Sequence, residues 1–224
     1  MKFHLLTIFP EIFDSYLNES ILKRAVEKKI IKFKTHNLRD YTTDKHQSVD
    51  DTPYGGGAGM LMKIEPLYKA LTAIKKLDKK VKPARRKILL MSAAGKTWNQ
   101  AMAQKYSKLD EIIFICGRYE GVDARIKNFI DEEISVGDYV LTGGELPALT
   151  IIDSITRLLP GVLGNKESII EESHSEVGVT EYPQYTRPEI FKVGAKKYSV
   201  PKVLLEGNHK KIKEWREKNQ SKKQ

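Results

Sequence analysis

Three glycine-rich segments of the sequence follow apolar stretches, and each could bring backbone groups close to a ligand. They are residues 92–95 (SAAG), 116–121 (CGRYEG) and 136–145 (VGDYVLTGGE). Glycine has no side chain, so neighbouring N–H and C=O groups can approach a bound molecule directly. A single segment of this kind is typical of an ordinary strand-to-helix turn, whereas three in succession favour a shared ligand pocket. None reads GxxxxGK[ST] or opens a helix as GxGxxG, so neither a P-loop nor the common dinucleotide signature is expected.

Ionisable side chains that could act as bases or charged partners lie further along the chain. Arg157 falls at the end of a predicted helix, and Glu171, Glu172 and His174 lie in the polar stretch that follows. Taken alone, two adjacent glutamates in such a stretch are typical of a solvated surface. A cation at a helix C-terminus is favoured by the helix dipole. These residues therefore permit acid–base chemistry without requiring it.

The periodicity of apolar residues predicts the elements that must position these segments. Strands are expected at residues 2–8, 30–37, 87–91, 111–116 and 133–136, and helices at 11–28, 64–76, 98–105, 123–130 and 147–159. Alternation of this kind, with continuously apolar strands, predicts an α/β fold whose mainly parallel sheet is covered on both faces. Ligands of such sheets bind beyond the carboxyl ends of the strands, where the glycine-rich segments fall. The polar loop 39–60 is long enough to be functional or disordered.

The sequence also predicts a division into domains. Residues 1–160 form the α/β domain, and residues 161–181, which are polar, acidic and punctuated by glycine, read as a flexible linker. Residues 182–224 are basic and contain a helical pattern at 208–218, which predicts a small helical domain.

Composition narrows the classes of partner. The formal net charge is +10, which favours polyanions such as nucleic acid. Two basic blocks, at residues 75–87 and 192–223, flank a neutral apolar middle and suggest a footprint around a site. No run of eighteen apolar residues is present, so we expect no membrane span. The single cysteine, Cys116, cannot form an intrachain disulfide, and we expect a cytoplasmic protein.

The glycine-rich segments carry a resemblance to a known family. CGRYEG followed by GDYVLTGGELPALTIIDSITRLLPGVLG resembles the defining stretch of the bacterial tRNA (guanine-N1)-methyltransferases, the TrmD family. The likeness extends to FPEIFDSYLNESILKRAVEK near the start, to the 39–60 loop, and to YPQYTRPEIF and LLEGNHKKIKEWR near the end. It implies a SPOUT fold with a deep C-terminal trefoil knot, an exception to the rule that chains do not thread their own loops. It also implies methyl transfer from S-adenosylmethionine to N1 of guanosine 37 in tRNA that carries G36-G37.

The resemblance places the methyl donor in the knot, held largely by backbone groups. The matching positions are Met91, Ser92, Gly95, Gly117, Tyr119, Glu120, Gly121, Ser135, Val136, Gly137, Asp138, Tyr139, Val140, Leu141, Gly143, Gly144 and Pro147. The family's first turn usually reads SPQG, and the SAAG found here leads us to expect a modest loss of donor affinity. The resemblance implies no structural metal site, although it links Glu120 to a possible Mg²⁺ requirement.

The resemblance also suggests the catalytic residues. N1 of guanine carries a proton at neutral pH, so a general base must remove it, and a cation would stabilise the charge that grows on O6. Arg157 matches the family's arginine, and Glu172 stands where the family has an aspartate base; Glu171 and His174 remain alternative bases.

The resemblance further implies a homodimer in which the partner's linker completes each site, and a basic C-terminal domain, here shortened, that clamps the anticodon stem-loop. The alternative is an inactive knotted RNA-binding protein, which the change from aspartate to glutamate and the short C-terminus would favour.

Overall fold

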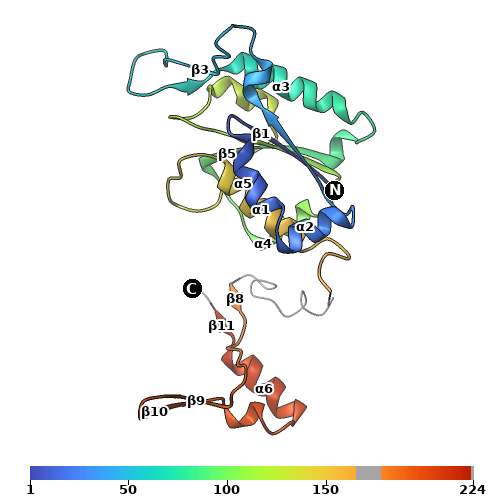
Figure 1. The fold of residues 1–224 in the computed structure, drawn as a ribbon, viewed down its shortest axis with the longest axis vertical. Coiled ribbons are helices and arrows are strands. Elements are labelled where there is room, and N and C mark those ends of the chain that lie inside the picture. The colour runs from blue at the N-terminus through green and yellow to red at the C-terminus, as the bar shows by residue number, and fades with distance from the viewer. Residues whose placement is uncertain (165–177, 223–224) are drawn as a thin grey trace. The chain divides into compact units, whose positions relative to one another are not determined.

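The computed structural model describes residues 1–164 and 178–222 (Figure 1). The chain divides into two compact units, Met1–Gly164 and Asn165–Gln224, and each is described by itself. The predicted linker 161–181 falls largely on residues outside the described part, so the predicted domain boundaries stay a prediction. No helix in the described part is both long and apolar enough to cross a membrane.

The first unit is built on a five-stranded sheet in the order β2-β1-β6-β5-β7. The strands are β1 (Lys2–Thr7), β2 (Lys32–Asn37), β5 (Arg86–Thr97), β6 (Glu111–Cys116) and β7 (Glu132–Ser135). All four neighbouring pairs are parallel, which confirms the predicted α/β fold with a parallel sheet. A short antiparallel pair, β3 (Asp50–Asp51) and β4 (Leu61–Met62), lies within the long polar loop.

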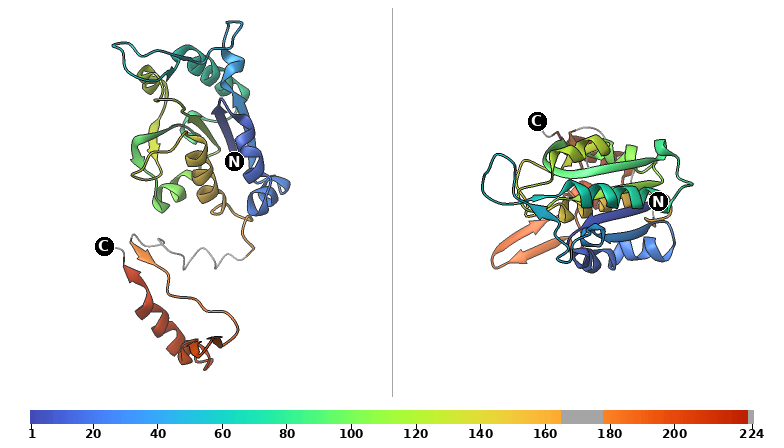
Figure 2. Two further views of the ribbon diagram at one scale, coloured as in Figure 1. Left: turned by 60° about the vertical axis from the view of Figure 1, so that its left-hand side comes forward. Right: turned by 90° about the horizontal axis from the view of Figure 1, so that it is seen from above.

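Helices cover both faces of this sheet (Figures 1 and 2). One face packs on η1 (Pro10–Phe13), α1 (Asp14–Leu17), α2 (Ser20–Glu27), α4 (Gln100–Tyr106) and α5 (Glu145–Thr156). The other packs on η2 (Leu38–Tyr41), α3 (Ile64–Leu77) and η4 (Ala124–Phe129). Alternation along β6 sends Phe114 into the first core and Ile113 and Ile115 into the second. The centre of the sheet is therefore buried on both sides, as its apolar strands predicted.

Two sequence predictions need correction in this unit. The helix predicted for 11–28 is broken, because Glu19 is extended (φ −122°, ψ 154°) between α1 and α2. The strand predicted for 87–91 continues to Thr97, so the segment 92–95 is part of β5 rather than a turn. The pairing of β5 with β7 is irregular between Met91 and Lys96. A Cβ on Gly95 would lie 2.5 Å from the backbone N of Ile134, so this close approach requires glycine.

The second unit is not purely helical, contrary to the prediction. It contains the helix α6 (His209–Asn219), the turn η6 (Lys202–Leu204), the hairpin β9 (Ile190–Val193) with β10 (Lys196–Ser199), and the short pair β8 (Val179–Thr180) with β11 (Ser221–Lys222). Trp215 packs against Tyr182 and Tyr185, with ring centroids 6.4 and 6.3 Å apart. Among residues 178–221 no side chain is fully buried, so this unit has a very small core.

A buried polar cluster extends from the amino ends of β5 and β6 across β1 to β2. His4 Nδ1 is 2.9 Å from His36 Nε2, and His4 Nε2 is 3.2 Å from a carboxylate oxygen of Glu111, which also pairs with Arg86. Burial is the main cause that lowers the pKa of both imidazoles to about 4, and the cations of Lys34 and Lys2 contribute to this shift at His4. Arg86 already neutralises Glu111, so that carboxylate does not reverse the effect. The fold therefore holds two neutral imidazoles.

These imidazoles predict a loss of stability in mild acid. Their folded pKa of about 4 lies below the ordinary 6.5, so the unfolded chain binds more protons between these pH values. Their contribution is present above pH 6.5 and is lost as the pH falls towards 4, by up to about 3 kcal/mol for each ring. Urea unfolding at pH 7, 5.5 and 4.5, followed by Trp98 fluorescence in a Trp215→Phe background, measures this loss. His36→Gln should flatten the dependence, whereas His46→Gln, which removes an exposed ring, should leave it unchanged.

Candidate functional site

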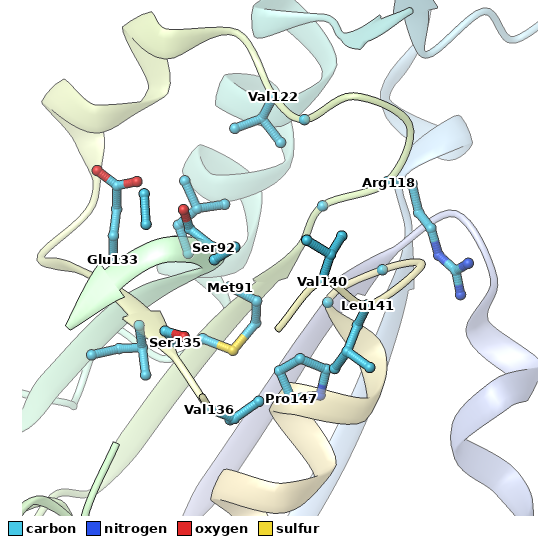
Figure 3. A pocket seen from close by; sticks show the side chains of 18 of the residues that line it. Met91, Ser92, Arg118, Val122, Glu133, Ser135, Val136, Val140, Leu141 and Pro147 are labelled. Carbon is cyan, nitrogen blue, oxygen red and sulfur yellow. The ribbon is translucent and has the colours of Figure 1, made fainter. Parts of the chain in front are cut away.

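A cavity of about 490 Å³ lies at the carboxyl ends of β6 and β7 and beside the middle of β5 (Figure 3). It is formed by residues 90–94, the turn 117–122, Ala124 and Lys127 of η4, residues 133–137 and 139–144, and Pro147 in the first turn of α5. The predicted donor-binding residues that line it are Met91, Ser92, Gly117, Tyr119, Glu120, Gly121, Ser135, Val136, Gly137, Tyr139, Val140, Leu141, Gly143, Gly144 and Pro147. Its volume falls within the range of small-molecule sites. The structure thus brings most of the predicted residues around one cavity.

Two of the predicted residues, Gly95 and Asp138, do not line this cavity. Gly95 is instead packed against the backbone of β7, where a Cβ would meet Glu133 C at 2.6 Å. Asp138 is exposed to solvent. Gly95 therefore supports the wall of the cavity from behind rather than facing it.

Close backbone packing explains one of the glycines that line the cavity, and backbone conformation explains another. The Gly144 N–H donates to the Gly117 carbonyl at 2.9 Å, which joins the segment before α5 to the turn after β6. A Cβ on Gly144 would lie 2.7 Å from Cys116 Cα, so no other residue fits here without a shift of the backbone. Gly121, with φ 135°, adopts a backbone conformation that other residues rarely adopt.

The long polar loop 39–60 is connected to the wall of the cavity. The Glu120 N–H donates to the Met60 carbonyl at 3.1 Å, and the Met62 N–H donates to the Gly121 carbonyl at 3.0 Å. Burial raises the pKa of Tyr119, and Asp50 in the loop adds to this shift. The described residues contain no group of three His, Cys, Asp or Glu side chains that could hold a metal ion.

Sequence reasoning missed three charged residues that line this cavity, and a fourth that pairs with one of them. Lys127 and Glu133 line it as an ion pair, with Nζ 2.7 Å from the carboxylate. Arg118 contributes backbone to the wall, and its side chain pairs with the buried Glu145. A signal for the second pair was present, because the two charges of opposite sign stand inside the glycine motifs, in CGRYEG and at the end of VLTGGE.

Arg157 lies in a second hollow of about 800 Å³, which shares Val136, Tyr139 and Leu141 with the cavity. The hollow is also lined by Tyr16 and Asp153, and the Tyr16 hydroxyl donates to the Asp153 carboxylate at 2.7 Å, which raises the pKa of Tyr16. Several apolar side chains of this hollow are exposed: Ile12, Tyr139, Leu141 and Leu146.

The other catalytic candidates, Glu171, Glu172 and His174, lie outside the described residues. The structure therefore places Arg157 beside the cavity and leaves its relation to the predicted base untested.

The basic block at 75–87 does not surround the cavity, contrary to the footprint suggested by the sequence. It leads into the amino end of β5, whereas the cavity lies at the carboxyl ends of the parallel strands. Three of its cations are already paired, Arg85 with Asp110, Arg86 with Glu111 and Lys87 with Asp131. These three cations therefore compensate acidic residues at the starts of neighbouring strands.

Known proteins resemble this chain over nearly its whole length. A family model described as tRNA (Guanine-1)-methyltransferase TrmD matches residues 1–224. A tRNA (guanine-N(1)-)-methyltransferase of Dictyoglomus turgidum is 51% identical over 223 residues, which cover 100% of this chain and 86% of that protein. A protein of the same description from Clostridioides difficile is 53% identical over 217 residues, which cover 96% of this chain and 90% of that protein.

A solved structure agrees with this assignment. The crystal structure of tRNA (m1G37) methyltransferase from Aquifex aeolicus superposes with a TM-score of 0.78 at 39% sequence identity, and the match covers 96% of this chain and 87% of that chain. With a cavity formed by the family's glycine motifs and a family match from end to end, this chain belongs to the TrmD family of tRNA (guanine-1)-methyltransferases.

Proposed function

We infer that this chain transfers a methyl group from S-adenosylmethionine to N1 of guanosine 37 in tRNA. The observation that carries this conclusion is the family match over residues 1–224. The Aquifex aeolicus protein is described as a tRNA (m1G37) methyltransferase, which supports position 37 as the target. A knotted enzyme that modifies another RNA position is disfavoured by GDYVLTGGELPA and YPQYTRPE, which match this family.

The cavity fits the methyl donor. Its wall is largely backbone at Gly117, Gly121 and Gly144, and backbone N–H and C=O groups are suited to pairing with the edge of an adenine. Apolar contacts from Met91, Val136 and Leu141 suit the faces of the base. The donor supplies an electrophilic methyl group on a sulfonium. The residues of this chain bind and orient it, and the enclosing wall limits access of water.

We also propose that the C-terminal part of the first unit is tied in a deep trefoil knot. The supporting observation is the path of the chain after β7, which is an edge strand of the sheet. From there the segment 136–144 returns to the turn after β6, where Gly144 bonds to Gly117, and α5 packs on β1 and β6 at the centre.

Glu172 is proposed as the general base that removes the proton from guanine N1. Arg157 is proposed as the cation that stabilises the negative charge that grows on O6. A glutamate reaches one methylene further than the aspartate of the family, and the residues around it must absorb this difference. Arg157 lies next to the donor cavity across Val136, Tyr139 and Leu141, which supports its assignment to the acceptor base. Holding donor and acceptor in line supplies a further part of the acceleration.

The site is proposed to be completed by a second copy of the chain. Exposed apolar side chains in the hollow around Arg157, such as Leu146 at 58%, suit an interface between two protomers. The linker of the partner would then bring its Glu172 to this site. The basic second unit, which carries Lys192, Lys196 and Lys197 on an exposed hairpin, is proposed to bind the tRNA. The reaction is proposed to take place in the cytoplasm.

Methyl transfer to a leucine-type tRNA transcript that carries G36-G37 tests the function directly. With labelled S-adenosylmethionine we expect incorporation that approaches one methyl group per tRNA and disappears when G37 is replaced by A. Donor binding without any transfer would instead favour the inactive RNA-binding alternative. Transfer that survives the replacement would assign a different target nucleotide.

Glu172→Gln tests the base. The amide cannot accept the N1 proton, so we expect turnover to fall about a hundredfold or more, while the dissociation constant of the donor stays within about twofold. Single-turnover kinetics and calorimetry measure the two quantities. Glu171→Gln is the matched control, because it removes the adjacent carboxylate. A loss in the control and normal turnover in Glu172→Gln would transfer the role to Glu171.

Arg157→Ala tests the electrostatic partner. Loss of a cation beside the developing charge is expected to lower turnover about a hundredfold without weakening donor binding. Arg157→Lys should recover part of the rate because it keeps the charge. Arg24→Ala, which removes an exposed arginine of α2, should behave as the wild type. Wild-type rates in Arg157→Ala would remove this residue from the mechanism.

A further inference from the structure

We propose that Arg118 is a positioning residue, which fixes the loop 137–144 in the shape that accepts the methyl donor. The inference rests on the proposed function, because it assumes that the donor binds in the cavity. Arg118 belongs to the turn after β6, and its side chain is directed away from the cavity, behind the loop (Figure 3). It acts through that loop rather than by contact with the donor.

The guanidinium of Arg118 joins its own turn after β6 to two segments that are far apart in the sequence, one around Phe9 and one at residues 142–145. Its Nε donates to Glu145 Oε2 at 2.9 Å, and one terminal nitrogen donates to the Thr142 carbonyl at 3.3 Å. Its Cζ lies 4.8 Å from the centroid of the Phe9 ring. The side chain therefore connects the residues after β1, the loop before α5 and the first residue of α5.

Glu145 fixes the orientation of Arg118. Its carboxylate is almost fully buried (side-chain exposure 1%), and Thr7 donates its hydroxyl proton to Oε1 at 2.6 Å. Glu145 is also the first residue of α5, where the helix dipole favours a negative charge. A buried carboxylate requires compensation, and Arg118 is the cation that pairs with it. The orientation of the guanidinium is thus set by buried partners.

The contact with the loop is tight enough to determine its path. A Cβ on Gly143 would lie 2.2 Å from Arg118 Nε, so the loop backbone rests directly on the guanidinium. The next residue, Gly144, bonds to Gly117, which is the neighbour of Arg118. The segment that contributes Val140 and Leu141 to the cavity is therefore supported from behind by one side chain. Without that support the loop keeps the hydrogen bond of Gly144 to the turn, but Thr142 and Gly143 lose the side chain on which they rest.

Two substitutions separate this positioning from general stability. Arg118→Gln leaves Glu145 without a cation, so we expect a lower melting temperature together with weaker donor binding. Arg118→Lys restores a charge beside Glu145 but lacks the planar fork that serves Glu145 and Thr142 together. We expect its melting temperature to return most of the way to that of the wild type, while donor affinity stays about tenfold weaker.

Calorimetry with S-adenosylhomocysteine, thermal melting, and steady-state kinetics with saturating tRNA measure these effects. KM for S-adenosylmethionine should rise with affinity, and kcat should stay within about twofold of the wild type, because the reacting groups are untouched. Arg85→Gln breaks an exposed pair with Asp110 at the amino ends of the strands, far from the cavity, and should change neither KM nor kcat. Glu145→Gln removes the anchor without altering Arg118 and should show the same selective loss of donor affinity.

Wild-type donor affinity in Arg118→Lys, or a recovery of affinity in step with the melting temperature, would overturn the inference and leave Arg118 with a purely structural role. A fall in kcat without a change in KM would also overturn it. A wild-type protein that binds no donor would instead refute the proposed function, so the two failures are distinguishable.

Discussion

The hydrogen bond from Gly144 N–H to the Gly117 carbonyl is the contact on which the rest of the site depends. It brings the segment that follows the edge strand β7 back to the turn after β6, past the middle of β5. The return path creates the cavity, because the loop 137–144 forms one wall and the turn 117–122 another. It also sets the start of α5 at Glu145, over the centre of the sheet. A side chain at position 144 would collide with Cys116 and Gly117 backbone atoms, so the arrangement requires glycine there.

The layered fold could be predicted from the sequence because strands and helices are marked by patterns of apolar residues within short segments. Strands such as β6, buried at every position, read as continuous apolar runs, and α3 shows a regular apolar face. The break at Glu19 was invisible because the apolar pattern continues across it. The extension of β5 through residues 92–95 depends on pairing with β7, a partner distant in sequence, and small residues there look like a turn. The exposed hairpin β9–β10 lacks the alternation of buried and polar residues by which strands are recognised.

The candidate site was predictable to the extent that glycine motifs mark backbone contacts. The cavity gathers residues from all three motifs, and family resemblance supplied which of them to choose. Gly95 and Asp138 fell outside the cavity because a motif gives positions along the chain and not the direction in which each residue faces. Arg118 and Glu145 were overlooked because their partnership spans the distance between two motifs, and only the folded chain brings them to 2.9 Å. Charge along the sequence was similarly misleading for residues 85–87, whose acidic partners are contributed by neighbouring strands and turns.

A buried glutamate paired with an arginine occurs at both ends of the strands, and the two pairs have different consequences. At the amino edge, buried Glu111 is compensated by Arg86 beside two neutral imidazoles, and the surrounding residues belong to regular strands. At the carboxyl edge, buried Glu145 is compensated by Arg118, and the guanidinium also touches an irregular loop. A buried ion pair has an exacting geometry, because each charge must keep its partner to offset the cost of desolvation. Where the neighbours are strands, their own backbone hydrogen bonds already fix the backbone, and the requirement changes little else. Where the neighbour is a loop without regular hydrogen bonding of its own, the requirement is transmitted to the loop and gives the binding cavity a defined wall.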